Sequence, residues 1–338
     1  MKIVRNLIAL GCALALLPAT LAPATAAPVK DSALKNLPTG FDMQAHRGGR
    51  GENLESSLPA FRHAIKLGVT TLELDVSLTK DGVPVIWHDI TLLKSKCRDT
   101  KPVTANDPLY PYAGKPVGVL TWKQVKTVVC DKRLKDFPQQ KANPGNKLIT
   151  LSQVFKLTKK MGANRIYFNI ETKTLPFITS DAEADNYVYT ILRECKKAGV
   201  LNRVTIQSFD WRTLALVRKL NRSIPTSMLL QASELNFIPI NPGIGPVDYA
   251  ATGGDPILAA KQLKAQIISP SYGNGANDLY ANKEFCDRAH KHGLRVVPYT
   301  VNDEASMRAL IRAGNDGYIT DYPTMGMKVA RQEGKLPA

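Results

Sequence analysis

The sequence predicts a parallel (β/α)8 barrel, an α/β fold, with one long insertion in an early βα loop. Eight short β-rich runs alternate with helical patterns, which is typical of parallel β/α units. No G-x-G-x-x-G loop joins a strand to a helix, which disfavours a doubly wound nucleotide-binding sheet. Without segments 1–27 and 90–148, about 250 residues remain, the usual size of one barrel.

The elements follow from hydrophobic periodicity and from glycine punctuation. Several helical patterns end at a glycine, the residue that most easily takes the left-handed conformation of a helix C-terminus. The predicted strands cover 42–46, 71–77, 165–171, 203–208, 225–230, 265–269, 295–300 and 317–320. The predicted helices cover 58–67, 151–161, 183–198, 211–220, 256–264, 283–292 and 304–313.

Segment 90–148 interrupts this alternation. It is rich in proline, lysine and asparagine, and it follows an early strand. We interpret it as a subdomain inserted in a βα loop near the active-site face of a single domain that covers 28–338.

Residues 1–27 have the pattern of a secretory signal peptide. Lys2 and Arg5 precede an apolar run at 7–17, and a small-residue A-x-A site lies at 24–26. The apolar run is too short to span a bilayer, and no later stretch of the sequence is long and apolar enough. The sequence therefore predicts an exported protein, periplasmic or secreted, with no stable membrane insertion.

The cysteines agree with export. Cys97 and Cys130 lie in the inserted segment and are the most favoured disulfide pair. Cys195 and Cys286 lie in predicted helices, where small buried thiols are expected. A lipoprotein would need Cys12 as its lipidated residue, but Cys12 lies in the middle of the apolar run. No C-x-x-C pair indicates a zinc or redox site.

The composition and net charge of the chain limit the kinds of binding partner that can be expected. With 44% hydrophobic and 22% charged residues, the chain is neither disordered nor a disulfide-dense miniprotein. Its 45 Lys and Arg residues against 29 Asp and Glu residues give a net charge of +16. This charge fits an anionic substrate, an anionic envelope surface or simply a solvated basic surface. The basic residues are scattered without interleaved aromatics, so we expect no nucleic-acid partner, and no protein partner is implied.

Acidic side chains follow two neighbouring predicted strands. Glu73 and Asp75 are two residues apart on one strand, so both face the barrel interior. Glu171 and Lys173 repeat this spacing at the end of the next parallel strand. Carboxylate oxygens are the ligands that Ca²⁺ and Mg²⁺ prefer, and a divalent cation would relieve the repulsion among three acids. The sequence thus predicts one divalent metal ion, Ca²⁺ or Mg²⁺.

Two histidines are placed at the same rim. His46 and Arg47 end the first strand. An Asp-Gly pair at 81–82 predicts a tight turn, after which the chain returns to His88. Two imidazoles beside a metal suit acid–base cleavage of a phosphate ester, with Arg47 and Lys173 available for the phosphate.

Nine short runs carry a resemblance to a known family. They are HRG at 46–48, ESSLPAF at 55–61, LELDV at 72–76, TKDG at 79–82, HD at 88–89, IETK at 170–173, QSF at 207–209, TVN at 300–302 and ITDYP at 319–323. Together they closely resemble the glycerophosphodiester phosphodiesterases, in particular the periplasmic type. The resemblance implies hydrolysis of a small-molecule glycerophosphodiester to an alcohol and sn-glycerol 3-phosphate.

The resemblance also implies roles for individual residues. His46 and His88 match the catalytic histidines of the family. The implied metal ligands are Glu73, Asp75 and Glu171, and the implied substrate contacts are Arg47, Lys173, Glu55, Gln207 and Tyr299. The family implies attack by the 2-hydroxyl of the substrate through a cyclic phosphate. Direct attack by water, the assignment of acid and base, the alcohol and the oligomeric state remain open.

The chain departs from the family pattern at two places. The family usually has Pro-Glu-Asn-Thr where this sequence has LESS at 54–57, and Glu55 holds the family position although Glu52 lies near it. Tyr299 replaces a familiar tryptophan, and it could still stack on an alcohol or fill the barrel mouth.

Two other functions are alternatives to the hydrolysis of glycerophosphodiesters. Related barrels cleave lysophospholipids or sphingomyelin, and such a substrate calls for an apolar loop at the mouth. Segment 90–148 is polar and lysine-rich, which disfavours it. An inactive barrel that only binds ligands would be expected to lack a histidine or an acid, and all are present.

Overall fold

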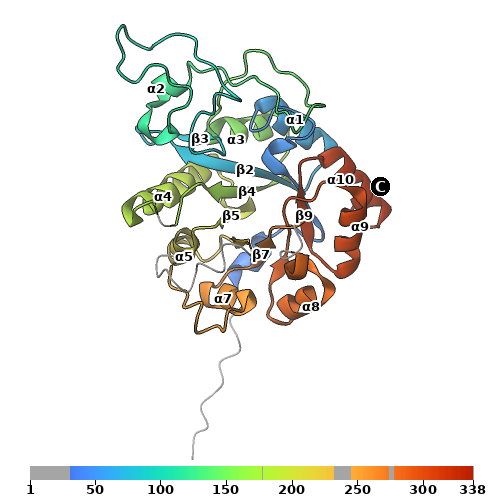
Figure 1. Cartoon of the computed structure of the whole chain (residues 1–338). Coiled ribbons are helices and arrows are strands. Elements are labelled where there is room, and N and C mark those ends of the chain that lie inside the picture. Colours follow the sequence, from blue (N-terminus) through green and yellow to red (C-terminus); the bar gives the residue numbers. More distant parts are fainter. Residues whose placement is uncertain (1–30, 177, 232–244, 274–277, 338) are drawn as a thin grey trace, which may run out of the picture. The chain divides into compact units, whose positions relative to one another are not determined.

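Parallel strands form the centre of the fold (Figure 1). The computed structural model describes residues 31–176, 178–231, 245–273 and 278–337, so the predicted signal peptide lies outside the described residues. The parallel strands are β1 (Asp42–Ala45), β2 (Thr71–Leu78), β4 (Tyr167–Thr172), β5 (Val204–Ser208), β6 (Thr226–Leu230), β7 (Ile267–Pro270), β8 (Arg295–Val296) and β9 (Gly317–Thr320).

The strands are ordered β8-β7-β6-β5-β4-β2-β1-β9. Backbone hydrogen bonds close the remaining seam: the N–H of Asp316 donates to the carbonyl of Val296, and the N–H of Ile319 donates to the carbonyl of Pro298, both at 2.9 Å. The predicted barrel is therefore confirmed. The predicted strand at 295–300 ends early because Pro298 has no N–H for a continuous ladder.

Helices cover the outside of the barrel. They are α1 (Leu58–Leu67), α3 (Leu151–Lys160), α4 (Asp181–Ala198), α5 (Trp211–Leu220), α7 (Pro256–Leu263), α8 (Lys283–Lys291), α9 (Glu304–Ala313) and α10 (Pro323–Gln332). The short helix α2 (Trp122–Val125) lies in the inserted segment. All seven predicted helices are present. Two helices were not predicted: α10, which begins at a proline in its first turn, and the short helix α2.

The start of α1 shows how local sequence sets an element. The Ser57 side chain accepts a hydrogen bond from the N–H of Ala60, which caps the helix. Gly68 ends the helix in the left-handed conformation, with φ 76°. The apolar face of α1, including Phe61 and Ala64, is buried in the main hydrophobic core.

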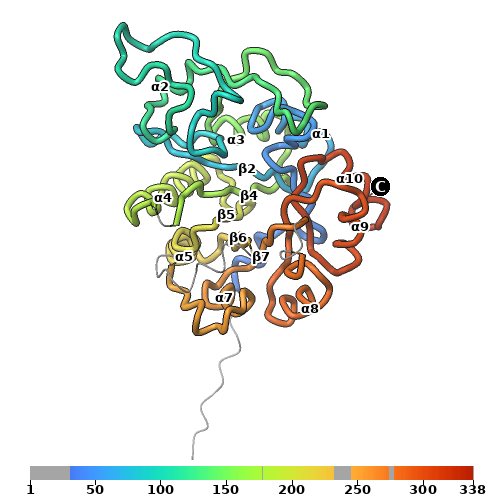
Figure 2. The backbone as a smooth tube through the Cα atoms, viewed as in Figure 1, coloured from blue at the N-terminus to red at the C-terminus, as the bar shows by residue number. Residues whose placement is uncertain are grey.

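The insertion has a small core of its own. The predicted hairpin is present: β3 (Pro84–Ile86) runs antiparallel to β2, and the mainly irregular segment 90–148 follows (Figure 2). Leu92, Tyr112 and Val125 are buried in this second cluster. Cys97 and Cys130 form a disulfide, as predicted.

The remaining described cysteines, Cys195 and Cys286, are free and buried, which confirms that prediction. No helix in the described ranges is long and apolar enough to cross a membrane.

Candidate active site

A sharp turn places the first histidine at the barrel mouth. Strand β1 ends at Ala45, and a 3-10 turn covers His46–Gly48. Arg47 has a φ of 50°, in the left-handed region that non-glycine residues rarely adopt. Gly49, with φ 101°, packs so closely against Pro323 that a Cβ atom would lie 2.7 Å from its ring. The turn is therefore fixed from both sides, and strained residues of this kind are common at functional sites.

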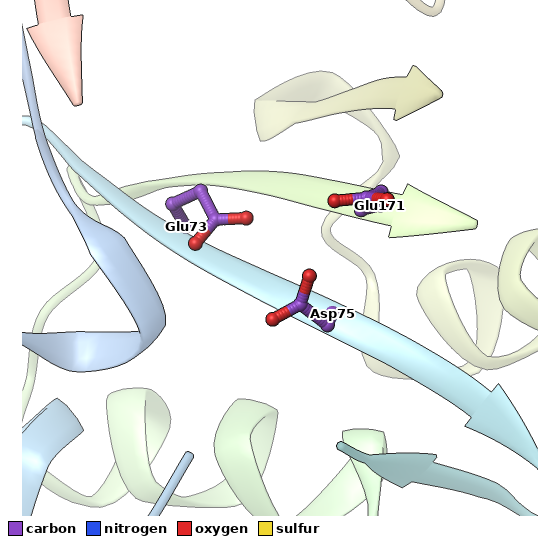
Figure 3. A group of neighbouring side chains, drawn as sticks. All are labelled: Glu73, Asp75 and Glu171. Atoms are coloured by element: carbon purple, nitrogen blue, oxygen red, sulfur yellow. The ribbon is translucent and has the colours of Figure 1, made fainter. Parts of the chain in front are cut away.

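The three predicted acidic ligands converge. Glu73 and Asp75 project from β2 and Glu171 from the adjacent β4 (Figure 3). Asp75 and Glu171 are direct register partners, so their side chains face the same space. One carboxylate oxygen from each residue lies within 4.8 Å of the others, and all three residues are buried.

The electrostatics of this triad fit a cation. Burial, and then the charge of Asp75, raise the pKa of Glu73 well above its usual range. Burial also raises the pKa of Glu171, against the charge of Lys173. Both carboxylate oxygens of Asp75 are buried and accept no hydrogen bond from any described residue. Crowded acids with unused lone pairs match the oxygen donor set of Ca²⁺ or Mg²⁺, so the residues fit the predicted metal.

Asp75 differs from its neighbours. Burial alone would raise its pKa, but the charges of His88, Arg47 and Lys173 hold it well below the usual range. The Nε atom of Arg47 lies 3.2 Å from Asp75 Oδ2, and the Nζ atom of Lys173 lies 3.9 Å from Asp75 Oδ1. Asp75 therefore stays charged, whereas the pKa values of Glu73 and Glu171 are raised.

His46 is held from one side by a carboxylate. Its Nδ1 lies 2.6 Å from Asp321 Oδ1, and its Nε2 lies 3.9 Å from Glu73 Oε2. Asn302 donates a hydrogen bond to the other oxygen of Asp321 at 2.8 Å. Because a charged carboxylate only accepts hydrogen bonds, Nδ1 carries the proton and Nε2 directs its lone pair toward the triad. Asp321 was not predicted as a site residue; its only signal was the ITDYP run.

His88 lies at the end of the β2–β3 hairpin, where the sequence placed it. A third of its side chain is exposed (33%), and its Nδ1 lies 3.3 Å from Asp89 Oδ1. Lys96, which was not a predicted site residue, donates to Asp89 Oδ2 and to Glu55 Oε1, each at 2.6 Å. The insertion therefore braces the loop that carries His88.

The two predicted phosphate contacts are ion-paired with the acids. Arg47 reaches Glu55 Oε2 at 3.2 Å as well as Asp75, and these charges raise its pKa against the effect of burial. Lys173 donates a hydrogen bond to Glu171 Oε1 at 2.8 Å. Burial lowers the pKa of Lys173, but the charges of Glu171 and Asp75 outweigh this effect and raise it. Both cations therefore remain charged beside the triad.

Glu55 and Gln207 have protein partners. Glu55 contacts Arg50 Nε at 3.2 Å besides Arg47 and Lys96, and the three cations lower its pKa against the opposing effect of burial. The Gln207 amide donates to Glu73 Oε1 at 2.7 Å. In this geometry both side chains anchor other site residues, and the predicted substrate contact stays a prediction for each.

A buried polar chain supports the triad from below. Asn169 donates to Gln207 Oε1 at 2.7 Å and to Gln44 Oε1 at 2.8 Å, and Gln44 donates to Asp42 Oδ2 at 2.8 Å. These side chains fill the barrel interior and fix the amide that holds Glu73.

Tyr299 lies beside the mouth. Its hydroxyl donates to the carbonyl of Leu230 at 3.3 Å, and its ring meets Phe209 edge to face with 6.0 Å between centroids. The two rings form an aromatic wall at the carboxyl ends of the strands.

A parallel barrel that gathers acids, histidines and cations at the carboxyl ends of its strands defines a barrel enzyme with a charged reaction centre. The model of the glycerophosphoryl diester phosphodiesterase family matches residues 46–325, and the chain belongs to this hydrolase family.

Similar proteins agree with this assignment. A glycerophosphodiester phosphodiesterase of Bacillus subtilis (strain 168) is 28% identical over 312 residues, which cover 90% of this chain and 92% of the relative. A second, from Caldanaerobacter subterraneus subsp. tengcongensis, is 28% identical and covers 86% of this chain and 98% of the relative. A crystal structure from Silicibacter pomeroyi DSS-3, assigned to the same class, is 27% identical with a TM-score of 0.73, covering 89% of this chain and 97% of that chain.

Proposed function

We propose that this enzyme hydrolyses glycerophosphodiesters to an alcohol and sn-glycerol 3-phosphate, with one divalent metal ion and an acid–base pair formed by His46 and His88. The observation that carries the proposal is the buried carboxylate of Asp75 between Glu73 and Glu171, whose two oxygens accept no hydrogen bond from any described residue. Family membership supplies the reaction class.

Glu73, Asp75 and Glu171 would hold Ca²⁺ or Mg²⁺. The bound cation would polarise the phosphoryl group and lower the pKa of a nearby hydroxyl. The remaining chemistry belongs to the side chains around this triad.

The two histidines divide the proton transfers. The Nε2 atom of His46 faces the triad because Asp321 fixes Nδ1. His88 lies on a different loop and lines the cavity beside Glu171 and Lys173. One imidazole takes a proton from the attacking hydroxyl, and the other gives a proton to the leaving alkoxide. Such help typically contributes about 10²–10⁴-fold in rate.

Arg47 and Lys173 bind the phosphate. Arg47 is buried and Lys173 is half-buried, and both are charged and lie within 4 Å of Asp75. Their donors can turn from the carboxylates to the nonbridging oxygens as negative charge develops in the transition state.

Export is part of the proposal. The Cys97–Cys130 disulfide fits an oxidising compartment, and segment 1–27 has signal-peptide features. N-terminal sequencing of the exported protein should begin at Ala27 or Pro28. A retained Met1, or a lipid on Cys12, contradicts this.

The direct test is release of glycerol 3-phosphate from glycerophosphocholine. We expect a chelator to abolish release, and added Ca²⁺ or Mg²⁺ to restore it. His46→Ala and His88→Ala should each lose about 10²–10⁴-fold in kcat. Full activity in chelator, or in His88→Ala, would reject the mechanism.

A further inference from the structure

Glu73 is held by two neutral hydrogen-bond donors. The backbone N–H of Arg47 donates to its Oε2 at 2.9 Å, and the Gln207 amide donates to its Oε1 at 2.7 Å. Each carboxylate oxygen of Glu73 therefore has one fixed partner and keeps a second lone pair for a cation. The direction in which this carboxylate points is thus set by groups outside the acidic triad.

The orientation of the Gln207 amide depends on Asn169. A side-chain amide can present either its oxygen or its NH₂ group, and only the NH₂ group attracts a carboxylate. The Nδ2 atom of Asn169 donates to Gln207 Oε1 at 2.7 Å, which fixes the oxygen of that amide on the side away from Glu73. The NH₂ group of Gln207 is therefore the end that faces Glu73.

Asn169 uses its second N–H in the opposite direction. It donates to Gln44 Oε1 at 2.8 Å, and Gln44 donates in turn to Asp42 Oδ2 at 2.8 Å. The result is one hydrogen-bonded chain of five side chains with a carboxylate at each end, Glu73 at one and Asp42 at the other. A chain that ends in two acceptors needs one member that donates in both directions, and among these five side chains Asn169 is that member.

Burial makes the direction of this chain hard to reverse. Its five residues are each 3% exposed or less, so their hydrogen bonds are not shared with bulk water. The Oδ1 atom of Asn169 has no hydrogen-bond partner among the described residues. A buried oxygen without a partner destabilises a fold, and here it accompanies an NH₂ group that makes two hydrogen bonds. The surroundings of Asn169 therefore select its donors and not its acceptor.

We propose that Asn169 is a positioning residue for the metal site, and that it acts by fixing the Gln207 amide so that its NH₂ group orients Glu73. The inference rests on the proposed function, in which Glu73, Asp75 and Glu171 hold the cation (Figure 3). Asn169 pairs with Glu73 across β2 and β4, and it precedes Glu171 by two residues on β4. It therefore lies one layer deeper in the barrel on the same face as the triad, and Gln207 is assigned to the metal site and not to the substrate.

The first test is Asn169→Asp, compared with the wild type by calorimetric titration of Ca²⁺ and Mg²⁺. An ionised aspartate keeps the shape of asparagine but only accepts hydrogen bonds. Both glutamine amides can then meet it only by turning their oxygens toward the two terminal carboxylates. We expect the metal affinity to fall by about 10–100-fold, the usual effect of losing an outer partner of a metal ligand. Equal affinity in the variant and the wild type would overturn the proposal.

Asn315→Asp is the matched control. Asn315 is also buried, and its NH₂ group also donates twice, to the carbonyls of Ala281 and Leu310 at 2.8 Å and 3.0 Å. Its Oδ1 likewise has no partner among the described residues. It lies between α9 and β9, at the opposite end of the strands from the triad. Asn315→Asp should lower the melting temperature and leave the metal affinity unchanged, and a loss of affinity equal to that in Asn169→Asp would contradict the assignment.

Gln207→Met tests whether Asn169 acts through Gln207, because methionine fills a similar space without an amide. It should lower the metal affinity by a similar factor, and adding Asn169→Asp to it should have no further effect. Additive losses would show that Asn169 acts by another route. This variant also carries the test if Asn169→Asp does not fold.

The same variant separates the metal site from the substrate. At saturating metal, we expect KM of Gln207→Met for glycerophosphocholine to stay within about twofold of the wild type. A rise in KM with unchanged metal affinity would make Gln207 a substrate contact and would overturn the proposal.

The wild-type titration reports the proposed function. If the wild type binds neither cation and hydrolyses glycerophosphocholine in chelator, the metal site is wrong and the positioning role is wrong with it. If the wild type binds a cation and every variant binds it equally well, the proposed function stands and only the positioning role is rejected.

Discussion

The Nδ1 atom of His46 lies 2.6 Å from Oδ1 of Asp321, across the pairing of the first and last strands of the barrel. The carboxylate thereby sets both the orientation of the imidazole and the nitrogen that carries its proton. Asn302 holds the second oxygen of Asp321, so the carboxylate itself has little freedom.

Replacing Asp321 should therefore cost activity without unfolding the protein. In Asp321→Asn the neutral amide can turn its NH₂ toward Nδ1, which places the imidazole proton on Nε2. We expect kcat to fall by about 10²-fold or more with little change in KM, because proton transfer by His46 is impaired.

A second His–carboxylate pair offers the control. His63 Nε2 lies 2.7 Å from Glu52 Oε2, outside the acidic triad. Glu52→Gln should keep kcat within about threefold of the unchanged enzyme. If Asp321→Asn and Glu52→Gln have equal effects on kcat, Asp321 has no special role.

Metal binding should be separable from proton transfer. At a metal concentration of about 100 Kd, the wild-type free energy of unfolding should rise by about 2.7 kcal/mol. Asp75→Asn should lose this increase, because its two oxygens have no other hydrogen-bond partner among the described residues. His88→Ala should keep it. Thermal unfolding in chelator and in Ca²⁺ or Mg²⁺ measures both, and an undiminished increase in Asp75→Asn would exclude that residue as a ligand.

The disulfide should stabilise the insertion. Cys97 and Cys130 are 33 residues apart in sequence, and closing such a loop is worth about 3–4 kcal/mol in the chain-entropy model. Cys97→Ser with Cys130→Ser should lower the free energy of unfolding by up to this amount. Reductant should destabilise the wild type and leave the double variant unchanged, and equal sensitivity of the two proteins would contradict the prediction.

Lys96 should position His88 through Asp89. Lys96→Met removes the cation that binds Asp89 Oδ2 and Glu55 Oε1. Glu55 keeps Arg47 and Arg50, whereas Asp89 keeps only His88 among its described ion-pair partners. We expect kcat to fall about tenfold and stability by about 1–3 kcal/mol. Lys94→Met, in the same segment, should change neither quantity; a matching loss there would remove Lys96 from its positioning role.

The same pair gives a pH dependence. Burial opposes the shift, but hydrogen bonds from His88 and Lys96 hold the pKa of Asp89 well below its usual range. A depressed carboxyl pKa contributes stability above the unfolded pKa of about 3.9, and this stability is lost as the pH falls toward the folded value. The stability difference between wild type and Lys96→Met should thus be largest near neutral pH and shrink below about pH 4. A difference that grows on acidification would contradict this.

Much of the fold was readable because periodicity and glycine punctuation are local signals. The alternation of strands and helices predicted the barrel. The i, i+2 spacing of Glu73 and Asp75 predicted that both side chains lie on the same face of their strand. Their proximity to Glu171 then follows from the parallel register between β2 and β4. These inferences depend only on residues that are close in sequence or that lie on adjacent strands.

The remaining features depend on contacts that no local pattern encodes. Asp321 reaches His46 only because β9 pairs with β1, and Lys96 reaches Asp89 only through the path of the insertion. The cavity beside Glu171 and Lys173 is likewise built from segments that are far apart in sequence. Composition averaged over 90–148 could not show which edge of the insertion faces the barrel.

The pairing of β1 with β9 also imposes an order in time. His46 is synthesised 275 residues before the carboxylate that orients it, and Asn302 also comes late. A growing chain therefore contains Glu73, Asp75 and Glu171 before it contains the carboxylate that orients His46. The hydrogen bond between His46 and Asp321 can form only after the last strand, β9, has been made and has paired with the first, β1.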